Sequence, residues 1–164
     1  MSNAGPVILY LDNTELYGSL KKAIKHYLTG GTGGVRSKFL DYLKKLQDSG
    51  GVVVLTSELA EFEAIRRLLT DFPELTFNKA LEAWMELRGR YDIRSIDLRD
   101  CKTINLDLKF FQKTGFDYKD GMHYSVAKKY GAFIVTGDGK FGETAEQVYK
   151  GKVLRRGDVY QKFK

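Results

Sequence analysis

The chain has 164 residues, which is enough for one domain that buries a core without disulfide bonds or a structural metal. Its single cysteine, Cys101, excludes an internal disulfide, a cysteine-rich zinc site and a paired-cysteine redox motif. No apolar run approaches the roughly 18 residues of a membrane-spanning helix, and the first residues lack the features of a signal peptide. We therefore expect one cytoplasmic domain over residues 1–164 that does not contact a membrane, with residues 1–5 a cloning remnant.

The net charge is +6, and nearly all of the excess lies at the C-terminal end. Residues 150–164 hold six Lys or Arg and one acidic residue, Asp158. Tyr160 and Phe163 are interleaved among these bases. Residues 156–164 are therefore predicted to form a basic tail, suited either to phosphate contact and base stacking or to simple solvation.

Short apolar runs rich in β-branched residues alternate with amphipathic segments along the chain. In chain order the predicted elements are strand 7–11, helices 14–28 and 35–48, strand 52–56, helices 58–72 and 78–91, strand 93–98, helices near 100–113 and 117–131, and strands 132–136 and 152–155. The glycine-rich segment 29–34 joins two helices and is predicted to be a flexible connection. Strands that alternate with helices indicate an α/β domain with a mainly parallel sheet.

Acidic residues recur where the carboxyl ends of the predicted strands meet. Asp12 ends the first strand, and Asp138 lies two residues beyond strand 132–136. Glu58 and Glu61 open the helix after the second strand and, three residues apart, share one of its faces. In an open parallel sheet functional groups gather at this edge, so we expect these carboxylates to converge.

A further pair of acids, Asp117 and Asp120, opens the helix that leads into strand 132–136 and therefore starts from the same edge. Carboxylates packed together oppose one another's ionisation, so such a cluster needs shared protons or bound cations. Oxygen ligands suit Mg²⁺ and Mn²⁺, which can serve phosphodiester cleavage. Each acid can also be a helix cap, and for Glu58 and Asp117 we favour that role. His123, one turn after Asp120, is interpreted as a structural or supporting residue.

Residues 137–142, GDGKFG, have the spacing of a dinucleotide-binding G-x-G-x-x-G loop. The helix predicted after them is short, and no second strand–helix–strand half remains for a dinucleotide to bridge. Phe141 stands where a P-loop has Ser or Thr. The glycines are instead predicted to turn the backbone so that Asp138 points into the acidic cluster while Phe141 anchors the loop. Tight binding of NAD would revive the nucleotide-binding interpretation.

Three segments, VILYLDNTEL, VVVLTSELAEF and DYKDGMHYSVAKKYGAFIVTGDGKF, resemble in that order the PIN-domain nucleases, from residue 7 to about 154. The most specific part is an Asp that opens a helix, followed by a strand and Thr-x-Asp-x-x-Phe. The resemblance implies a three-layer α/β/α sandwich with a central, mainly parallel sheet of about five strands, an acidic Mg²⁺ or Mn²⁺ site and hydrolysis of single-stranded RNA. Many members are toxins of toxin–antitoxin pairs, so an antitoxin protein and a second copy of the chain are the further partners implied.

Residue by residue, the family's four acids fall on Asp12, Glu61, Asp120 and Asp138, which would be both metal ligands and catalytic residues. Glu61 is preferred to Glu58 because LAEF resembles the family's small-residue, Glu, apolar context.

The remaining assignments are supporting ones. Thr14 and Thr136 match positions that could orient a metal ligand or its water. Lys140, Arg155 and Arg156 would neutralise the RNA backbone. Residues 73–114 match nothing specific in the family. The alternative function is a catalytically inactive PIN-like module that binds RNA or a protein.

Overall fold

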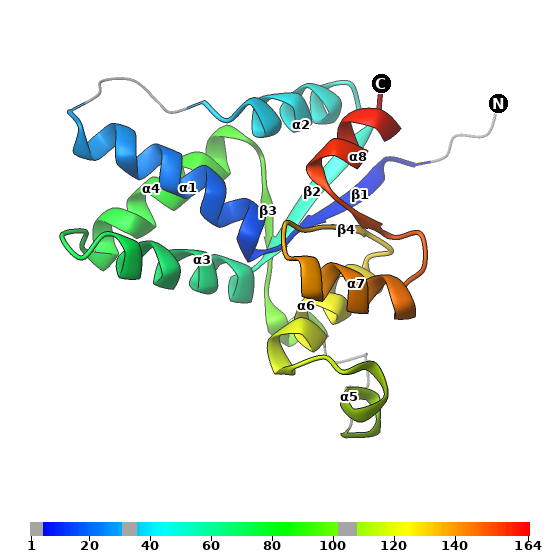
Figure 1. Cartoon of the computed structure of the whole chain (residues 1–164). Helices are drawn as coiled ribbons and strands as arrows, with labels where there is room; N and C mark the ends of the chain where they lie inside the picture. The colour runs from blue at the N-terminus through cyan, green and yellow to red at the C-terminus, as the bar shows by residue number, and fades with distance from the viewer. Residues whose placement is uncertain (1–4, 31–35, 102–107) are drawn as a thin grey trace.

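Five parallel strands form one central sheet in the computed structural model, which describes residues 5–30, 36–101 and 108–164 (Figure 1). The strands are β1 (Val7–Leu11), β2 (Val52–Ser57), β3 (Arg94–Ile96), β4 (Phe133–Val135) and β5 (Val153–Leu154). They lie in the order β3-β2-β1-β4-β5, and every neighbouring pair is parallel. All five predicted strands are present, and β3, β4 and β5 are shorter than expected.

Alternate residues of β1 enter two separate cores. Leu9 and Leu11 belong to the larger core on one face of the sheet, whereas Tyr10 belongs to the smaller core on the other face. Successive side chains of a strand point to opposite faces, so an unbroken apolar run such as VILYL can fill both cores. The sheet is therefore covered on both sides.

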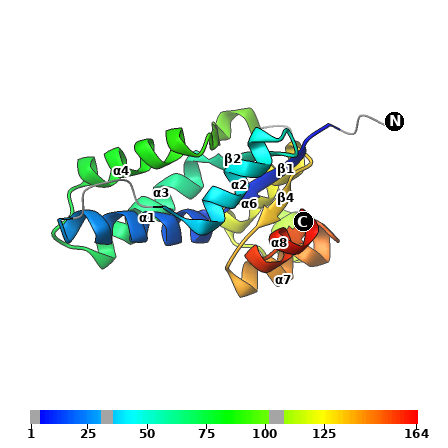
Figure 2. The same ribbon diagram turned by 90° about the horizontal axis from the view of Figure 1, so that it is seen from above.

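Helices cover each face in the manner of a three-layer α/β/α sandwich (Figures 1 and 2). The larger core is covered by α1 (Asn13–Leu28), α2 (Lys38–Asp48), α3 (Glu58–Asp71), α4 (Phe77–Arg90) and α8 (Arg156–Lys162). The smaller core is covered by α5 (Leu108–Thr114), α6 (Tyr118–Lys129) and α7 (Gly139–Val148), together with the short 3-10 turn η1 (Leu98–Cys101). The predicted fold class is confirmed.

The chain changes direction across the sheet between β1 and β4. From β1 it moves outward to β2 and then β3, and it next returns to the far side of β1 to form β4 and β5. Helices after β1 and β2 lie on one face, and those before and after β4 lie on the other. Such a switch point opens a crevice outside the carboxyl ends of the two strands, where parallel α/β proteins bind ligands.

Three sequence predictions need correction or fall outside this description. Residues 156–164 are not a free tail, because 156–162 form α8 and Val159 is fully buried. Tyr160 packs against Phe39 and Tyr42 and so does not offer its ring for base stacking. The helix expected near 100–113 begins only at Leu108 in the described part, and residues 1–4, 31–35 and 102–107 lie outside it.

Among the described helices, none combines the length and the apolar character needed to cross a membrane.

Candidate active site

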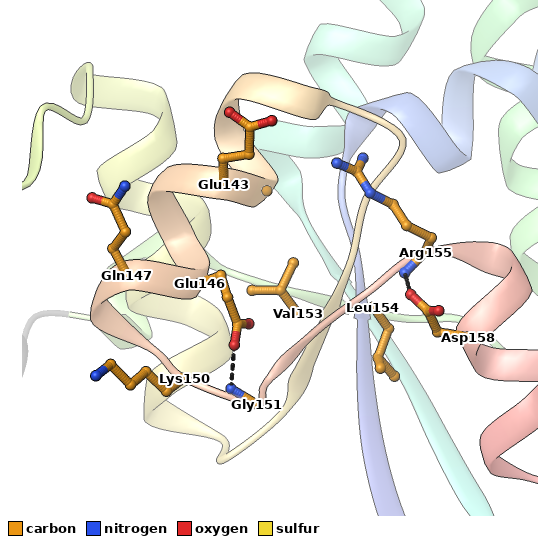
Figure 3. A pocket seen from close by; sticks show the side chains of 10 residues that line it. Glu143, Glu146, Gln147, Lys150, Gly151, Val153, Leu154, Arg155 and Asp158 are labelled. Carbon is orange, nitrogen blue, oxygen red and sulfur yellow. Dashed lines mark hydrogen bonds between the residues drawn. The ribbon is translucent and has the colours of Figure 1, made fainter.

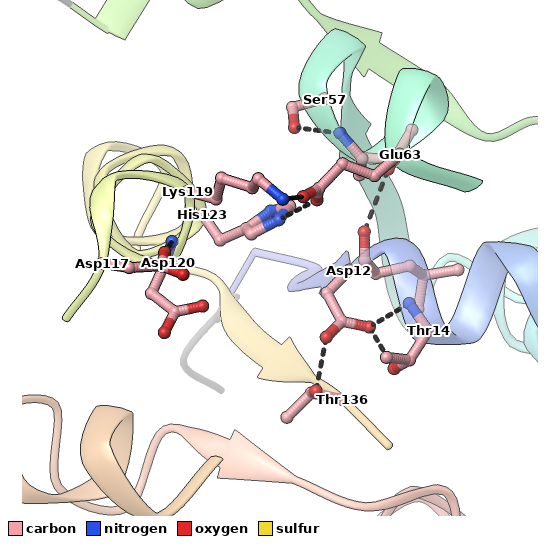
Figure 4. A network of polar contacts seen from close by, with 12 residues as sticks. Asp12, Thr14, Ser57, Glu63, Asp117, Lys119, Asp120, His123 and Thr136 are labelled. Atoms are coloured by element: carbon pink, nitrogen blue, oxygen red, sulfur yellow. Dashed lines mark hydrogen bonds and ion pairs between the residues drawn. The ribbon is translucent and has the colours of Figure 1, made fainter. Parts of the chain in front are cut away.

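Asp12 lies at the end of β1, at the switch point, and its side chain is 1% exposed. One carboxylate oxygen, Oδ1, accepts hydrogen bonds from the backbone N–H and the hydroxyl of Thr14, at 3.0 and 2.6 Å, and from the backbone of Glu15 at 3.3 Å. The other, Oδ2, accepts from the Thr136 hydroxyl (Figure 4). Burial raises the pKa of Asp12, and these donors partly oppose that effect.

The loop after β4 is linked to the same carboxylate through the hydroxyls of Thr14 and Thr136. The backbone N–H of Gly137 donates to the Thr14 hydroxyl at 2.8 Å, and that of Asp138 donates to the Thr136 hydroxyl at 3.0 Å. A Cβ at Gly137 would come within 3.3 Å of the Thr14 hydroxyl, so this approach favours glycine. The two threonines therefore tie β1 to the loop that carries Asp138.

Asp138 caps α7, because its side chain accepts from the backbone N–H of Phe141 at 3.0 Å. Phe141 is 3% exposed and lies against Phe116 and His123. The GDGKFG segment is thus a strand-to-helix turn anchored by Phe141, as the sequence predicts, and it leaves the Asp138 residue exposed.

Two acids stand at the start of α6. Asp117 caps the helix, as predicted, by accepting from the backbone N–H of Asp120 at 2.9 Å. Burial and the neighbouring Asp117 charge raise the pKa of Asp120 to about 6, and the Asp138 and Glu63 charges act in the same direction. Asp120 is therefore a partly buried carboxylate facing other carboxylates, which is the electrostatic situation that a bound cation relieves.

Glu63 of α3 contacts α6 through a polar chain that continues into the core. Its Oε2 lies 2.8 Å from Nε2 of His123 and its Oε1 lies 3.2 Å from Nζ of Lys119 (Figure 4). Nδ1 of His123 is 2.6 Å from the Tyr10 hydroxyl, which is 2.9 Å from that of Ser57. Burial raises the pKa of Glu63, but its hydrogen bonds with His123 and Lys119, together with the Lys119 charge, outweigh that effect and lower the pKa overall.

If His123 is neutral and carries its hydrogen on Nε2, every donor in this series of polar side chains has an acceptor. Ser57 then donates to Tyr10, Tyr10 donates to Nδ1 of His123, and Nε2 donates to Glu63. The side chains of Ser57, Tyr10 and His123 are nearly inaccessible to water. The orientation of Glu63 is thus set by buried groups, and His123 has the supporting role that the sequence predicts.

The structure does not bring Glu61 to these groups. Glu61 pairs with Arg88 of α4, with an Nη1–Oε1 distance of 3.3 Å. Residues two apart lie on nearly opposite sides of a helix, so Glu61 faces α4 whereas Glu63 faces α6. Glu58 is exposed, and Ser57 rather than Glu58 caps α3. The acid of α3 that contacts α6 is therefore Glu63, which no residue context in the sequence distinguishes.

A second feature missed by the sequence analysis is Glu15, a nearly buried acid one helical turn after Asp12. Burial raises the pKa of Glu15, and the hydrogen bond and charge of Arg156 partly compensate. Arg156 of α8 pairs with the Glu15 carboxylate, while Arg155 donates from Nη1 to the Thr136 carbonyl at 3.1 Å. Both arginines predicted to bind RNA thus already hold α8 to the site.

A groove of about 890 Å³ lies between α7 and the segment from β5 to α8 (Figure 3). Several of its polar groups are satisfied within the fold, since Glu146 accepts from the backbone of Gly151 and Asp158 from that of Arg155, both at 2.7 Å. Asp12 and Asp120 do not line it. The groove is therefore separate from these two acids.

The chemistry of the acidic site suits a hard divalent cation, because its donors are carboxylate oxygens and Asp120, which lies near three other acids, forms no ion pair with a described residue. Within residues 5–30, 36–101 and 108–164, no three acidic, His or Cys side chains are grouped closely enough to hold an ion as they stand. Asp12 is engaged by hydroxyl donors and Glu63 by Lys119 and His123. The donor set fits a cation in kind, and its side chains would have to reorient to surround one.

The fold and this site define the chain as a parallel α/β protein with acidic residues at the switch point of its sheet. No family model matches the chain, and no curated protein does. Among solved structures, the crystal structure of PAE2754 from Pyrobaculum aerophilum is similar, with a TM-score of 0.56 and 13% sequence identity over 95% of this chain and 94% of that one. At this identity the likeness concerns the fold alone.

Proposed function

We propose that the protein is a metal-dependent endoribonuclease of the cytoplasm that hydrolyses phosphodiester bonds in single-stranded RNA. The observation that carries this proposal is that Asp120 lies near the charges of Asp117, Asp138 and Glu63, while Asp12 ends the neighbouring strand β1 at the switch point. The resemblance of the segments around them to PIN-domain nucleases supports the same chemistry.

In this proposal Asp12, Asp120 and Asp138 hold Mg²⁺ or Mn²⁺, and Glu63 takes the place that the sequence assigns to Glu61. The ion supplies activation of water and stabilisation of the leaving oxygen. Thr14 and Thr136 hold the Asp12 carboxylate in one orientation through their hydroxyls. The exposed Lys140, two residues after Asp138, is suited to contact the RNA backbone.

The test is cleavage of a labelled single-stranded RNA with Mn²⁺ and with a chelator. Wild type is expected to cleave only with the metal, and Asp12→Asn to lose cleavage because it removes a charge at the centre of the site. Asp48→Asn, an exposed change at the end of α2, is the control and should cleave normally. Equal rates for Asp12→Asn and wild type would refute the assignment.

Metal binding is measured separately through thermal stability. A ligand that binds the folded state raises the melting temperature by mass action, so Mn²⁺ should stabilise wild type more than Asp12→Asn or Asp138→Asn. This readout does not depend on turnover.

An inactive RNA- or protein-binding module is the second candidate, and one observation favours it. Two acids of α3 are already paired with cations within the fold, Glu61 with Arg88 and Glu63 with Lys119. RNA affinity without metal-dependent turnover would select this function.

The resemblance also extends the proposal to a toxin held by an antitoxin protein, for which recovery of a stable complex with the product of a neighbouring gene is the test.

A further inference from the structure

Lysine side chains gather at the amino-terminal ends of β4 and β5, at the end of the sheet opposite the acidic site. Lys152 immediately precedes β5, and Lys162 ends α8. Both ammonium groups lie over the ring of Phe133, the first residue of β4, with Nζ 4.2 and 4.8 Å from the ring centroid. In Figure 1 the C-terminus, beyond α8, lies toward the same end of the sheet as the start of β1.

A third lysine lies beside this pair. Lys129 ends α6, and its Nζ is 5.8 Å from the centroid of the Tyr130 ring. The Nζ of Lys152 donates to the carbonyl of Gly131 at 3.4 Å, which places the end of α6 next to Lys152. Lys129 and Lys162 are exposed, and none of the three lysines forms an ion pair with a described residue.

Helix dipoles account for only part of this cluster. Lys129 and Lys162 stand at the C-terminal ends of helices, where a positive charge is favourable. Lys152 lies outside any helix and adds a further positive charge at the same place. A contact between an ammonium group and an aromatic ring attracts the cation but leaves its charge in place. The cluster therefore remains positive and is suited to a negatively charged ligand.

Helix α8 connects the lysines to the acidic site. It begins at Arg156, which pairs with Glu15 beside Asp12, and it ends at Lys162. At a rise of 1.5 Å per residue, the two ends of α8 are about 9 Å apart. Phosphates of one strand follow each other about every 3.4 Å along a nucleic-acid helix, so this distance corresponds to about three nucleotides. One RNA strand can therefore reach both places.

We propose that Lys129, Lys152 and Lys162 form a lysine anchor that binds RNA phosphates a few nucleotides away from the bond that is cleaved. The strand runs along α8 from the acidic site to the anchor. Lysine suits this role because its ammonium group binds phosphate as a point charge, and contacts to phosphate do not depend on base sequence. An acidic protein is the other polyanion of matching charge, and the short distance to the acidic site favours RNA.

The inference rests on the proposed function for the identity of its ligand, but it concerns binding and not cleavage. The experiment therefore measures binding of a labelled single-stranded RNA by fluorescence anisotropy with a chelator present. Lys152→Gln with Lys162→Gln should weaken binding at low salt about tenfold or more. The slope of log affinity against log salt should become shallower by about 1.4, because each phosphate contact of a single strand contributes about 0.7.

Two control variants separate the anchor from general effects of charge and packing. Lys22→Gln with Lys25→Gln removes two exposed charges from α1 and should bind RNA as tightly as wild type. Lys152→Arg with Lys162→Arg keeps both anchor charges and should also bind like wild type. If the glutamine pair lowers the melting temperature, Lys162→Gln alone should still make the salt slope shallower by about 0.7. An unchanged affinity and salt slope in the glutamine variants would overturn the anchor.

Cleavage with Mn²⁺ shows which proposal fails if one does. Wild type should have a lower KM for a long RNA than for one too short to reach the anchor, and the glutamine pair should remove that difference. Metal-dependent cleavage without any preference for length would refute the anchor and leave the nuclease intact. Weakened binding in the glutamine pair without cleavage by wild type would refute the nuclease alone. Tighter binding of polyglutamate than of RNA would assign the lysines to an acidic protein and overturn the anchor.

Discussion

Glu63 and His123 are joined by a 2.8 Å contact across the interface between α3 and α6. Glu61, two residues earlier on α3, contacts α4 through Arg88 instead. The two glutamates therefore have different structural environments despite their proximity in the sequence, and the difference can be measured in activity.

Replacing Glu63 and Glu61 separately distinguishes them. If Glu63 belongs to the acidic site, Glu63→Gln should lower the rate of Mn²⁺-dependent RNA cleavage about 10- to 100-fold, the usual range when a group that supports a metal site is lost. Glu61→Gln is the matched control, since it removes the same charge from the same helix, and it should cleave nearly as fast as wild type. The reverse order of rates would restore Glu61 as the second acid.

The series of buried polar side chains that orients Glu63 should also stabilise the fold. His123→Ala removes the ring nitrogens that face the Tyr10 hydroxyl and Glu63 inside a buried part of the fold, so the free energy of unfolding in urea should fall by about 1–3 kcal/mol. Tyr10→Phe, which removes only a hydroxyl, should cost less. If His123→Ala were as stable as wild type, this series of buried polar contacts would contribute nothing to the stability of the fold.

The raised pKa of Asp120 predicts how stability varies with pH in the absence of metal. Between its ordinary value of 3.8 and the folded value of about 6, the folded state keeps a proton that the unfolded state has released. The contribution of Asp120 is therefore fully present below pH 3.8 and is lost as pH rises through about 6.

Asp120→Asn removes this titration. Relative to wild type, the variant should gain stability as pH rises from about 4 to about 7, with most of the gain complete just above the folded pKa. The measurement is urea unfolding at several pH values with a chelator present. A difference between the two proteins that stayed constant with pH would show that Asp120 ionises in the folded protein as it does in the unfolded chain.

The ion pair between Arg156 and Glu15 should hold α8 to the site. Arg156→Ala leaves the Glu15 carboxylate, whose side chain is 4% exposed, without its cation, and we expect a loss of about 1–3 kcal/mol in the free energy of unfolding. Adding Glu15→Gln should recover part of that loss, because a neutral side chain is less costly to bury. Additive losses in the double variant would mean that the two residues do not interact.

Much of the fold follows from local patterns. The apolar runs at 7–11, 52–56 and 132–136 are buried strands, because a strand covered on both faces must be apolar at every position. The turn at GDGKFG also follows from a local pattern, in which glycines after a strand precede an aromatic anchor. Segments 93–98, 132–136 and 152–155 give shorter strands than predicted, since strand ends are less marked in the sequence than strand centres.

The sequence by itself determined the α/β class and the edge of the sheet at which Asp12, Asp120 and Asp138 stand, because strand periodicity and helix starts are local properties. Tertiary structure alone decided which acid of α3 faces α6, that Glu15 lies buried beside Asp12, and that the basic C-terminal segment is a packed helix. Each of these depends on which side of a helix meets a neighbour from a distant part of the chain. That choice is made by the packing of whole elements against one another, and spacing along the chain does not encode it.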